Sequence, residues 1–441
     1  MTIRDRGGNF LFPLLLPGLL LAGCTPRFEE PGHTAPQAEA SARRQFKSQL
    51  ISQTIERPLK TFPDKEHEEA WEGAFWGMGL ARYRSPITDE AVLKGYASAE
   101  SLSVSFHRSL LEVTYTLYRG ELQDQVSRFL MNTGEEKLFA MAALHLLRDK
   151  PDGDARTLGT LMQERFQGWR EHPILVSLSY DLDSFAHRVS YVHPPLVDIL
   201  KHRFSPAAPA VFSFQRTDRR WPGLVLVRDA SGRFFRNNDG SLFCVPQLAL
   251  AASNLPGYLT NGNTPQGVLS MQGFLPVTNT FIGPTETIQL VLPFEAPVQT
   301  FFHVADTRDT VWTQNLYAQL LPESWREFTP AFEAFRAGRA GRTEIIAHGT
   351  TIDPEFYRGE PCYPNTPSQG CLTALEVWSS TTGKNCSSDQ QALVDMLKKH
   401  QAGGGFFYVI NLDDRGGPVA LEEVETEILR AEGMPGGAGV K

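Results

Sequence analysis

The hydrophobic pattern divides the chain into a helical half and a strand-rich half. Between about residues 66 and 200, apolar residues recur every three or four positions, which is typical of amphipathic helices. Short polar breaks, such as Asn132-Thr133-Gly134, separate the apolar runs. The pattern therefore predicts paired helices with short connections, without the clean period that would define a repeat. Two of the runs are Leu110, Val113 and Leu117, and Leu138, Met141, Ala142, Leu144 and Leu147.

After Pro206 the pattern changes to short strands and turns. Leu224 to Val227 and the segment from Arg228 to Phe234, which contains a Ser-Gly turn, predict a hairpin. Thr287 to Phe294 and Thr300 to Val304 continue the strand pattern. We therefore expect a multidomain α+β protein. Its helical domain would span 61–205, its predominantly β domain 206–422, and a C-terminal tail 423–441.

The first 24 residues have the pattern of a lipoprotein signal peptide. Arg4 and Arg6 precede an apolar run from Phe10 to Leu21, and Leu21-Ala22-Gly23-Cys24 resembles the lipobox of bacterial lipoproteins. In such proteins the chain is cut before the cysteine, which then carries the lipid. The apolar run is too short for a dependable membrane-spanning helix, and an ordinary signal peptide or a buried strand is the alternative.

The segment after Cys24 indicates where in the cell the protein is located. Residues 25–60 are rich in Pro, Ala, Glu and Gln near their start and predict a flexible tether. Thr25 occupies the position at which an aspartate would signal retention at the inner membrane. We expect a periplasmic protein held by a lipid on Cys24, with the outer membrane as its destination.

Charge and histidine spacing exclude two classes of function. The formal net charge of the 441 residues is −8, and no clustered basic stretch is present, which argues against nucleic acid as a partner. The histidines of the helical half lack the tight spacing of metal ligands. We expect no metal ion, and a helical half that positions the rest of the chain or binds a protein partner.

Candidate chemistry concentrates on one histidine and one cysteine. A β-branched run that begins at Thr343 predicts a strand that ends on His348, and Cys371 follows a turn of small residues that begins at Ser368. A thiol and an imidazole form a self-sufficient nucleophile and base. Prolines and glycines between them predict a loop that returns Cys371 beside His348. A core histidine beside a buried or disulfide-bonded cysteine is the alternative.

These residues resemble the catalytic signature of the L,D-transpeptidase family, also called the YkuD-like domain. The chain has His-Gly-Thr from His348, a loop rich in Pro and Gly, and Ser-x-Gly-Cys ending at Cys371. The segment 262–269, GNTPQGVL, is similar to the Thr-Pro-x-Gly segment of that family. The resemblance covers about residues 206–422. It departs at Gln369, where the family usually has His, and at Thr373, where it usually has Arg.

The resemblance implies a reaction on the stem peptides of peptidoglycan without a cofactor. Cys371 would attack the carbonyl of the L-configured centre of a diamino acid and expel the terminal D-residue. His348 would act as base and then as acid, and the N–H groups of Gly370 and Cys371 would face the oxyanion. An amine from a neighbouring stem would then form a cross-link. Ser368 completes the expected catalytic turn, and the expected substrate contacts are Thr264, Pro265, Gly267, Gly349 and Tyr357.

Three alternatives remain at this point. Water in place of the amine would make the protein an L,D-carboxypeptidase that trims tetrapeptide stems. Gln369 and Thr373 favour a non-catalytic lipoprotein that binds peptidoglycan. Tyr357 is alternatively a packing residue of its loop.

One disulfide is possible among the three further cysteines, which are Cys244, Cys362 and Cys386. A bridge between Cys362 and Cys386 would hold the loop that carries Cys371.

Overall fold

The computed structural model describes residues 32–98, 101–148, 155–187, 192–205, 208–305 and 309–434. The predicted signal peptide and its Cys24 lie outside these ranges. Among the described residues, no helix is long and apolar enough to cross a membrane.

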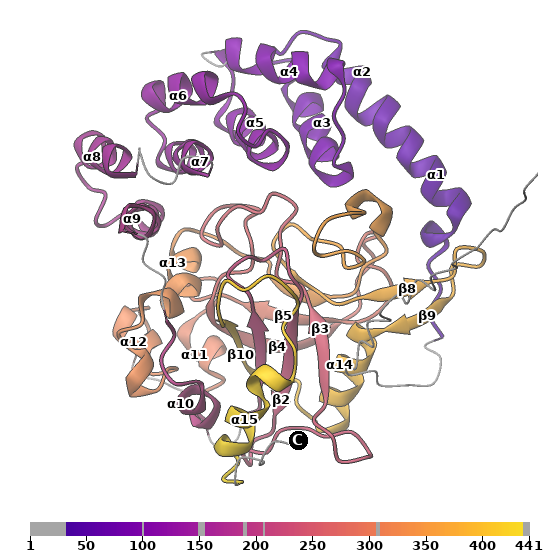
Figure 1. Ribbon diagram of the computed structural model, residues 1–441, viewed down its shortest axis with the longest axis vertical. Helices are drawn as coiled ribbons and strands as arrows, with labels where there is room; N and C mark the ends of the chain where they lie inside the picture. Colours follow the sequence, from indigo (N-terminus) through magenta and orange to yellow (C-terminus); the bar gives the residue numbers. More distant parts are fainter. Residues whose placement is uncertain are drawn as a thin grey trace, which may run out of the picture.

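The first part of the chain is an arc of helices that lies over the strand-rich part (Figure 1). Neighbouring helices pack in pairs, α3 with α5, α6 with α7 and α8 with α9, which confirms the prediction of paired helices. The helices of this part are α1 (Ala40–Gln49), α2 (Arg57–Leu59), α3 (Glu68–Ala81), α4 (Pro86–Ala97), α5 (Val104–Leu117), α6 (Gln123–Asn132), α7 (Glu136–Leu147), α8 (Ala155–Arg165) and α9 (Pro173–His187).

Side-chain caps fix the start of two of these helices. The Ser85 hydroxyl accepts a hydrogen bond from the N–H of Thr88, and Pro86 takes the first helical position of α4. The Ser103 hydroxyl accepts one from the N–H of Phe106 at 3.1 Å at the start of α5. These local signals explain why the connections between helices are short.

The helices begin earlier than predicted, so the tether expected over 25–60 is wrong for its described residues. Helical structure runs from Ala40 to Leu59, and the segment Leu50–Glu56 between α1 and α2 is a π-helix. Leu50 and Ile55 are buried against Gly77 of α3. The N–H of Ala35 also donates to the carbonyl of Gly383 at 2.8 Å. The sparse apolar residues of this segment suffice to bury one helical face.

Eight strands form one sheet that closes on itself. Their order is β3-β2-β1-β10-β4-β5-β6-β7. Just beyond β3, Leu248 exchanges two backbone hydrogen bonds, each 2.8 Å long, with Thr373 of β7. These bonds join the first and last strands, as in a barrel. The strands are β1 (Ala210–Gln215), β2 (Gly223–Arg228), β3 (Cys244–Gln247), β4 (Gly267–Leu275), β5 (Thr287–Val291), β6 (Ile346–His348), β7 (Leu372–Thr373) and β10 (Gly404–Asn411), and β8 (Glu376–Trp378) pairs separately with β9 (Asn385–Ser388).

Both faces of the sheet are buried. Val225, Leu269 and Phe407 belong to the core that also contains α14, whereas the next residues along β2 and β10 belong to a second core. Burial on both faces explains the continuous apolar runs in β1 and β2. The remaining helices of the strand-rich part are α10 (Leu196–Lys201), α11 (Val298–Phe302), α12 (Gln314–Ala318), α13 (Glu333–Arg339), α14 (Asp389–Lys399) and α15 (Glu422–Ala431).

One prediction for the strand-rich part is confirmed and two differ from the structure. The hairpin after Leu224 is confirmed, since Arg228 bridges Phe234, but the strand predicted from Thr300 to Val304 is mostly α11. The expected tail over 423–441 contains nearly all of α15, whose Val424 and Ile428 are buried beside α10. These short helices form because their apolar residues cover the outer face of the sheet.

The helical arc and the strand-rich part share two of the hydrophobic cores. The core that contains α14 also contains buried residues of α7, α8 and α9. The other is called the shared core below. Trp71 and Phe106 of the arc belong to the same buried cluster as Leu250 and Tyr357 of the strand-rich part. The composition is therefore mixed α and β as predicted, but the proposed boundary at 205/206 does not separate two independent cores.

Replacing Tyr357 tests this shared core. Tyr357 is fully buried, so Tyr357→Ala is expected to lower the free energy of unfolding by about 3–5 kcal/mol, as for other buried aromatic residues. Phe62→Ala is the matched control, because Phe62 is 65% exposed, and it should change stability by less than about 0.5 kcal/mol. Denaturant unfolding followed by circular dichroism measures both. Equal effects would contradict the assignment of Tyr357 to the core.

Candidate active site

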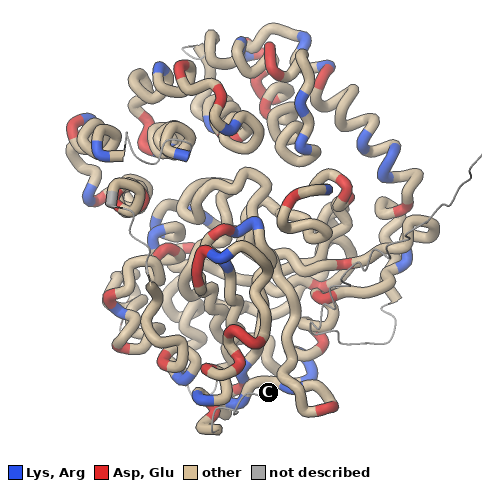
Figure 2. Tube along the Cα trace, viewed as in Figure 1, with Lys and Arg blue, Asp and Glu red and all other residues tan. Residues whose placement is uncertain are grey.

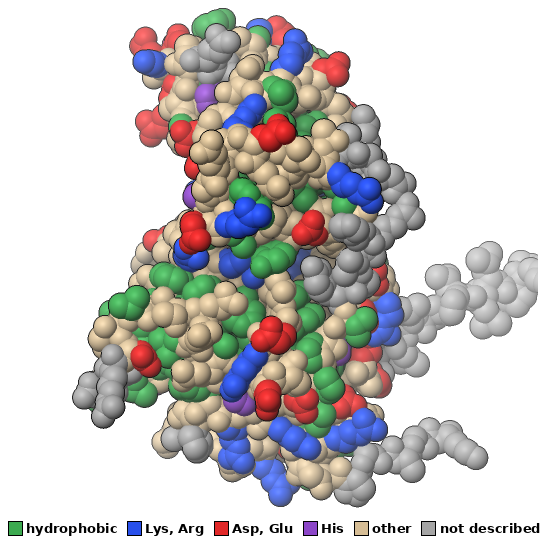
Figure 3. Space-filling model, turned by 90° about the vertical axis from the view of Figure 1, so that its left-hand side faces the viewer, with side chains coloured by type: hydrophobic (Ala, Val, Ile, Leu, Met, Phe, Trp, Pro, Cys, Tyr) green, Lys and Arg blue, Asp and Glu red, His purple; other side chains and the backbone are tan. Residues whose placement is uncertain are grey.

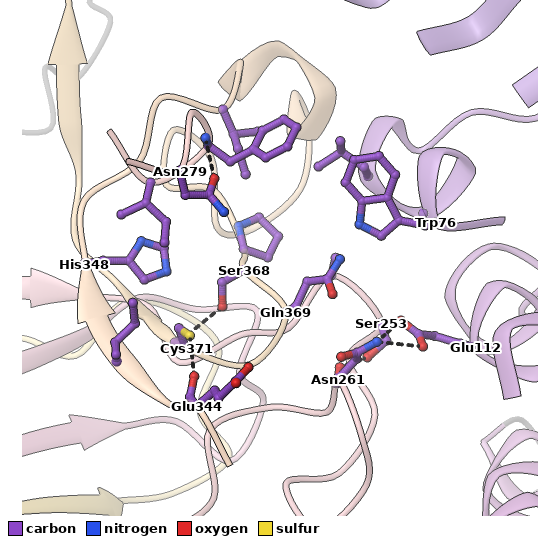
Figure 4. Close-up of a pocket in the computed structure, with 18 of the residues that line it drawn as sticks. Trp76, Glu112, Ser253, Asn261, Asn279, Glu344, His348, Ser368, Gln369 and Cys371 are labelled. Carbon is purple, nitrogen blue, oxygen red and sulfur yellow. Dashed lines mark hydrogen bonds between the residues drawn. The ribbon is translucent and has the colours of Figure 1, made fainter. Parts of the chain in front are cut away.

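Strand pairing brings His348 and Cys371 to the same face of the sheet. β6 and β7 are parallel, with Ala347 opposite Leu372 and His348 opposite Thr373. Cys371 immediately precedes β7, so this register places it beside Ile346. Since side chains alternate along a strand, Cys371 and His348 point to one face as diagonal neighbours. Figure 4 shows the imidazole and the thiol on the same side of a cavity.

A backbone contact sets the tautomer of His348. Its Nδ1 lies in hydrogen-bonding contact with the carbonyl oxygen of Gly349. A carbonyl can only accept, so Nδ1 carries the proton and Nε2 has a free lone pair. Burial lowers the pKa of His348 to about 4, and the bond to Gly349 opposes this shift. The imidazole is therefore neutral near pH 7 and able to accept a proton at Nε2.

The Cys371 thiol is also neutral in this resting arrangement. Its Sγ donates to the carbonyl oxygen of Glu344 at 3.6 Å (Figure 4). Burial raises its pKa, while the N–H of Ile346 and the charge of Arg342 act in the opposite direction. The pair thus begins as thiol and neutral imidazole, and His348 has to take the proton as the sulfur attacks.

Ser368 organises the turn before the cysteine. Its hydroxyl accepts from the N–H of Gly370 at 3.0 Å and donates to the carbonyl of Cys371 at 2.8 Å. Gly370 has a φ of +119°, which favours glycine. The N–H of Gly370 is consequently engaged inside the turn, contrary to the expected role in an oxyanion hole. The N–H of Cys371 has no hydrogen-bond partner among the described residues and remains a donor for that role.

Hydrogen bonds from a threonine and an arginine hold the backbone of this turn. The Thr264 hydroxyl donates to the carbonyl of Gly370 at 2.9 Å. The Arg342 guanidinium donates to the same carbonyl at 3.4 Å and to that of Asn263 at 2.8 Å, and it also bonds the carbonyls of Gly257 and Gly262. Thr264 therefore positions the cysteine turn instead of lining the cavity. Arg342 carried no recognisable sequence signal and was missed.

The other predicted substrate contacts also lie outside the cavity lining. Pro265 is buried against Gly257, and Gly267 lies where an added Cβ would come within 2.5 Å of the Tyr317 hydroxyl. Gly349 packs against Glu376. Tyr357 belongs to the shared core, which supports the alternative that it is a packing residue of its loop. The glycines are needed for close backbone packing.

Glu376 is a buried carboxylate that sequence analysis did not identify. A Cβ on Gly349 would lie 2.1 Å from its carboxyl group. Its Oε1 accepts from the hydroxyls of Thr285 at 2.5 Å and Ser388 at 2.8 Å, and burial raises its pKa to about 7. Glu376 therefore packs against the backbone of Gly349, whose carbonyl orients the imidazole. In the sequence, a lone glutamate at the start of a short strand does not indicate such a contact.

The helical arc forms one wall of the cavity. The cavity has a volume of about 1070 Å³ and extends from His348 and Cys371 to α3 and α5. Trp76 lies on the far wall, and the Glu112 carboxylate accepts from the Asn261 amide at 3.1 Å (Figure 4). The sequence gives no signal that the arc contributes to the site. Five lining residues are charged: Glu72, Arg108, Glu112, Glu295 and Glu344.

The two departures from the family signature have different surroundings. Gln369 lines the cavity, and its amide extends away from the thiol toward the arc (Figure 4). The Thr373 hydroxyl instead donates to the carbonyl of Thr366 at 2.8 Å and is buried. Only Gln369 is therefore placed to contact a ligand.

The expected bridge between Cys362 and Cys386 is wrong. Both thiols are free; Cys362 is buried in the shared core, whereas Cys386 is exposed on β9. Packing and hydrogen bonds hold the loop in place of a disulfide. Over the described ranges, no group of three or more His, Cys, Asp or Glu side chains forms a candidate metal site.

No family model, curated protein or solved structure matches this chain.

The neutral pair predicts a distinctive pH profile. His348 should assist the acylation of Cys371 by a small activated ester down to a pH of about 4. Below that pH the acylation rate should fall, because protonation of Nε2 removes the base. With an ordinary histidine, the rate would fall near about pH 6.5. Intact-protein mass measures the acylation rate, and His348→Gln should lack this acid limb. A midpoint near that ordinary value in the wild type would contradict the buried, neutral imidazole.

Proposed function

We propose that this protein is a cysteine L,D-transpeptidase that acts on peptidoglycan stem peptides through a thioester on Cys371. The observation that carries the proposal is the shared face of His348 and Cys371, with Nδ1 of the imidazole bound to the Gly349 carbonyl and Nε2 left as a base. The resemblance of the two short motifs supplies the substrate class.

The first half-reaction would form the thioester. As Sγ of Cys371 attacks the carbonyl carbon, Nε2 of His348 takes the thiol proton, and the N–H of Cys371 donates to the oxyanion. The imidazolium then gives its proton to the nitrogen of the departing D-residue, and the C–N bond breaks. Stem and enzyme are left joined through sulfur.

The second half-reaction would release the product. An amine of a second stem attacks the thioester, Nε2 of His348 takes an amine proton and the sulfur leaves as thiolate, which recovers a proton from the imidazolium. Water in place of the amine gives the trimmed stem of an L,D-carboxypeptidase. The cavity volume of about 1070 Å³ is at the upper end for ligand sites, which favours a site that admits two peptide ends.

The lining of the cavity supports a peptide ligand. Beyond the five charged residues, it contains the amide side chains of Asn261, Asn279, Gln272, Gln289 and Gln369. An amide presents both a donor and an acceptor, as the peptide backbone does. Binding without turnover is the second candidate, because the raised pKa of the Cys371 thiol makes it a poor nucleophile unless His348 takes its proton.

Product analysis with purified tetrapeptide-stem muropeptides tests catalysis. Cys371→Ala should abolish new dimers and trimmed stems, and His348→Gln should slow the reaction by roughly two to four orders of magnitude through loss of the base. Cys386→Ala is the matched control, since it removes another free thiol, which is exposed and does not line the cavity. A folded Cys371→Ala protein with wild-type turnover would refute the mechanism and favour the binding role.

We also propose that the protein is anchored by a lipid on Cys24 in the periplasm, with the outer membrane as the destination. Cys24→Ser should move it from the membrane fraction to the soluble periplasmic fraction, because the acyl chains supply the binding energy. Fractionation and immunoblotting measure this change, with Cys386→Ala as control. Membrane partitioning that is unchanged in Cys24→Ser would exclude the anchor.

A further inference from the structure

A second cavity lies where the end of the helical arc meets the sheet part. It has a volume of about 290 Å³. Its walls come from Arg170 and the first half of α9, and from the stretch that runs from α12 through α13. Figure 3 looks at this side of the molecule, where several Lys and Arg side chains gather between the upper helical part and the lower part. Four arginines line the cavity: Arg170, Arg326, Arg336 and Arg339.

The charge of this cavity contrasts with the rest of the chain. The formal net charge is −8, and residues of both signs are interspersed over the fold (Figure 2). Among the residues that line the cavity, Glu327 is the single carboxylate. Four guanidinium groups around a small volume repel one another, and an anion between them would remove that repulsion.

Two of the arginines are fixed by the fold. Arg336 donates from Nε to the Ser177 hydroxyl at 3.1 Å and from Nη1 to the Thr329 carbonyl at 3.2 Å, with its guanidinium 5.0 Å from the Tyr180 ring centre. Arg339 donates to the carbonyl of Glu171 at 3.1 Å. These contacts join α13 to α9 and to the segment before it, and they hold cationic groups at the cavity wall.

The other two arginines have no carboxylate partner in the described part of the chain. Arg326 donates from Nε to the carbonyl of Leu321 at 3.3 Å, and Arg170 stacks over the ring of Trp169 at 4.5 Å. Both are exposed on the rim of the cavity. Their terminal nitrogens are therefore available to a ligand.

The nearby acids other than Glu327 lie outside the cavity lining. Asp181 and Glu333 act electrostatically on Arg336, but neither lines the cavity. The Asp181 carboxylate accepts from the Tyr258 hydroxyl at 2.6 Å, and that of Glu333 accepts from the N–H groups of Gly257 and Gln266. The Glu171 carboxylate lies 3.8 Å from Arg339 and is largely exposed.

The start of α9 adds to the positive potential. Pro173 and Val176, from the first turn of this 15-residue helix, line the cavity. The N-terminus of a helix carries a partial positive charge and unpaired N–H groups, which favour anions. The helix terminus and the four arginines converge on one small space.

We propose that this cavity binds a phosphate or diphosphate group, presented either by a soluble compound or by a phospholipid headgroup. The planar, forked guanidinium matches phosphate oxygens, and several arginines around one site are the arrangement that such groups favour. A volume of about 290 Å³ is small for a ligand site and suits one compact anion. The bound group would link α9 of the arc to α13 of the sheet part.

Calorimetry at constant ionic strength tests the site with inorganic phosphate and with diphosphate. Every sample carries Cys24→Ser, so that a lipid anchor makes no contribution. Arg170→Gln and Arg326→Gln should each weaken binding at least about tenfold, since each removes a charge-assisted hydrogen bond. Arg128→Gln is the matched control, because Arg128 is exposed on α6 and outside the cavity. It should bind as the unsubstituted protein does.

A vesicle arm distinguishes the two sources of phosphate. Binding to phosphatidylglycerol vesicles and not to phosphatidylcholine vesicles, lost in both cavity variants, identifies a lipid headgroup. Binding of the inorganic anions alone identifies a soluble ligand. Absence of binding to every probe overturns the proposal. Binding that Arg170→Gln and Arg326→Gln leave unchanged, or that Arg128→Gln weakens equally, overturns it as well.

Discussion

Closure of the sheet is the constraint on which the candidate site depends. The two backbone hydrogen bonds between Leu248 and Thr373 connect the ends of an eight-stranded sheet. They fix the start of β7, and therefore the position of Cys371 relative to His348 on β6. The segment after Leu248 continues alongside the cysteine turn, where Ala252 donates to the carbonyl of Ser368 at 2.8 Å. Backbone pairing thus places Cys371 relative to His348, and the side chains of Ser368, Thr264 and Arg342 hold the turn in that position.

Burial then determines the chemical state of the pair. Removing the imidazole from water disfavours its charged form, and the same effect on the thiol disfavours the thiolate. The resulting neutral pair is less reactive toward adventitious electrophiles than an ion pair, because the thiolate is the nucleophile. Proton transfer to His348 has to accompany attack, so productive chemistry requires a substrate that places its carbonyl carbon beside the sulfur.

Sequence analysis identified the features of the fold and site that depend on local pattern. The strand ending at His348 and the small-residue turn before Cys371 were readable from β-branched residues and from glycine. Thr264 was noticed, but its hydrogen bond to the carbonyl of Gly370 could not be foreseen, because the two residues are 106 positions apart. Arg342 and Glu376 were missed for the same reason: their effect comes from long-range contacts with backbone groups. The contribution of α3 and α5 to the cavity wall could not be predicted from the sequence, because it depends on how the arc lies over the sheet.

The position of the arc has a consequence for access to the thiol. Trp76 stands across the cavity from Cys371, so the sulfur is approached between two parts of the chain instead of from an open surface. A ligand that reaches the thiol would therefore contact helices and strands together, so residues of α3 and α5 would help to decide what the cavity admits.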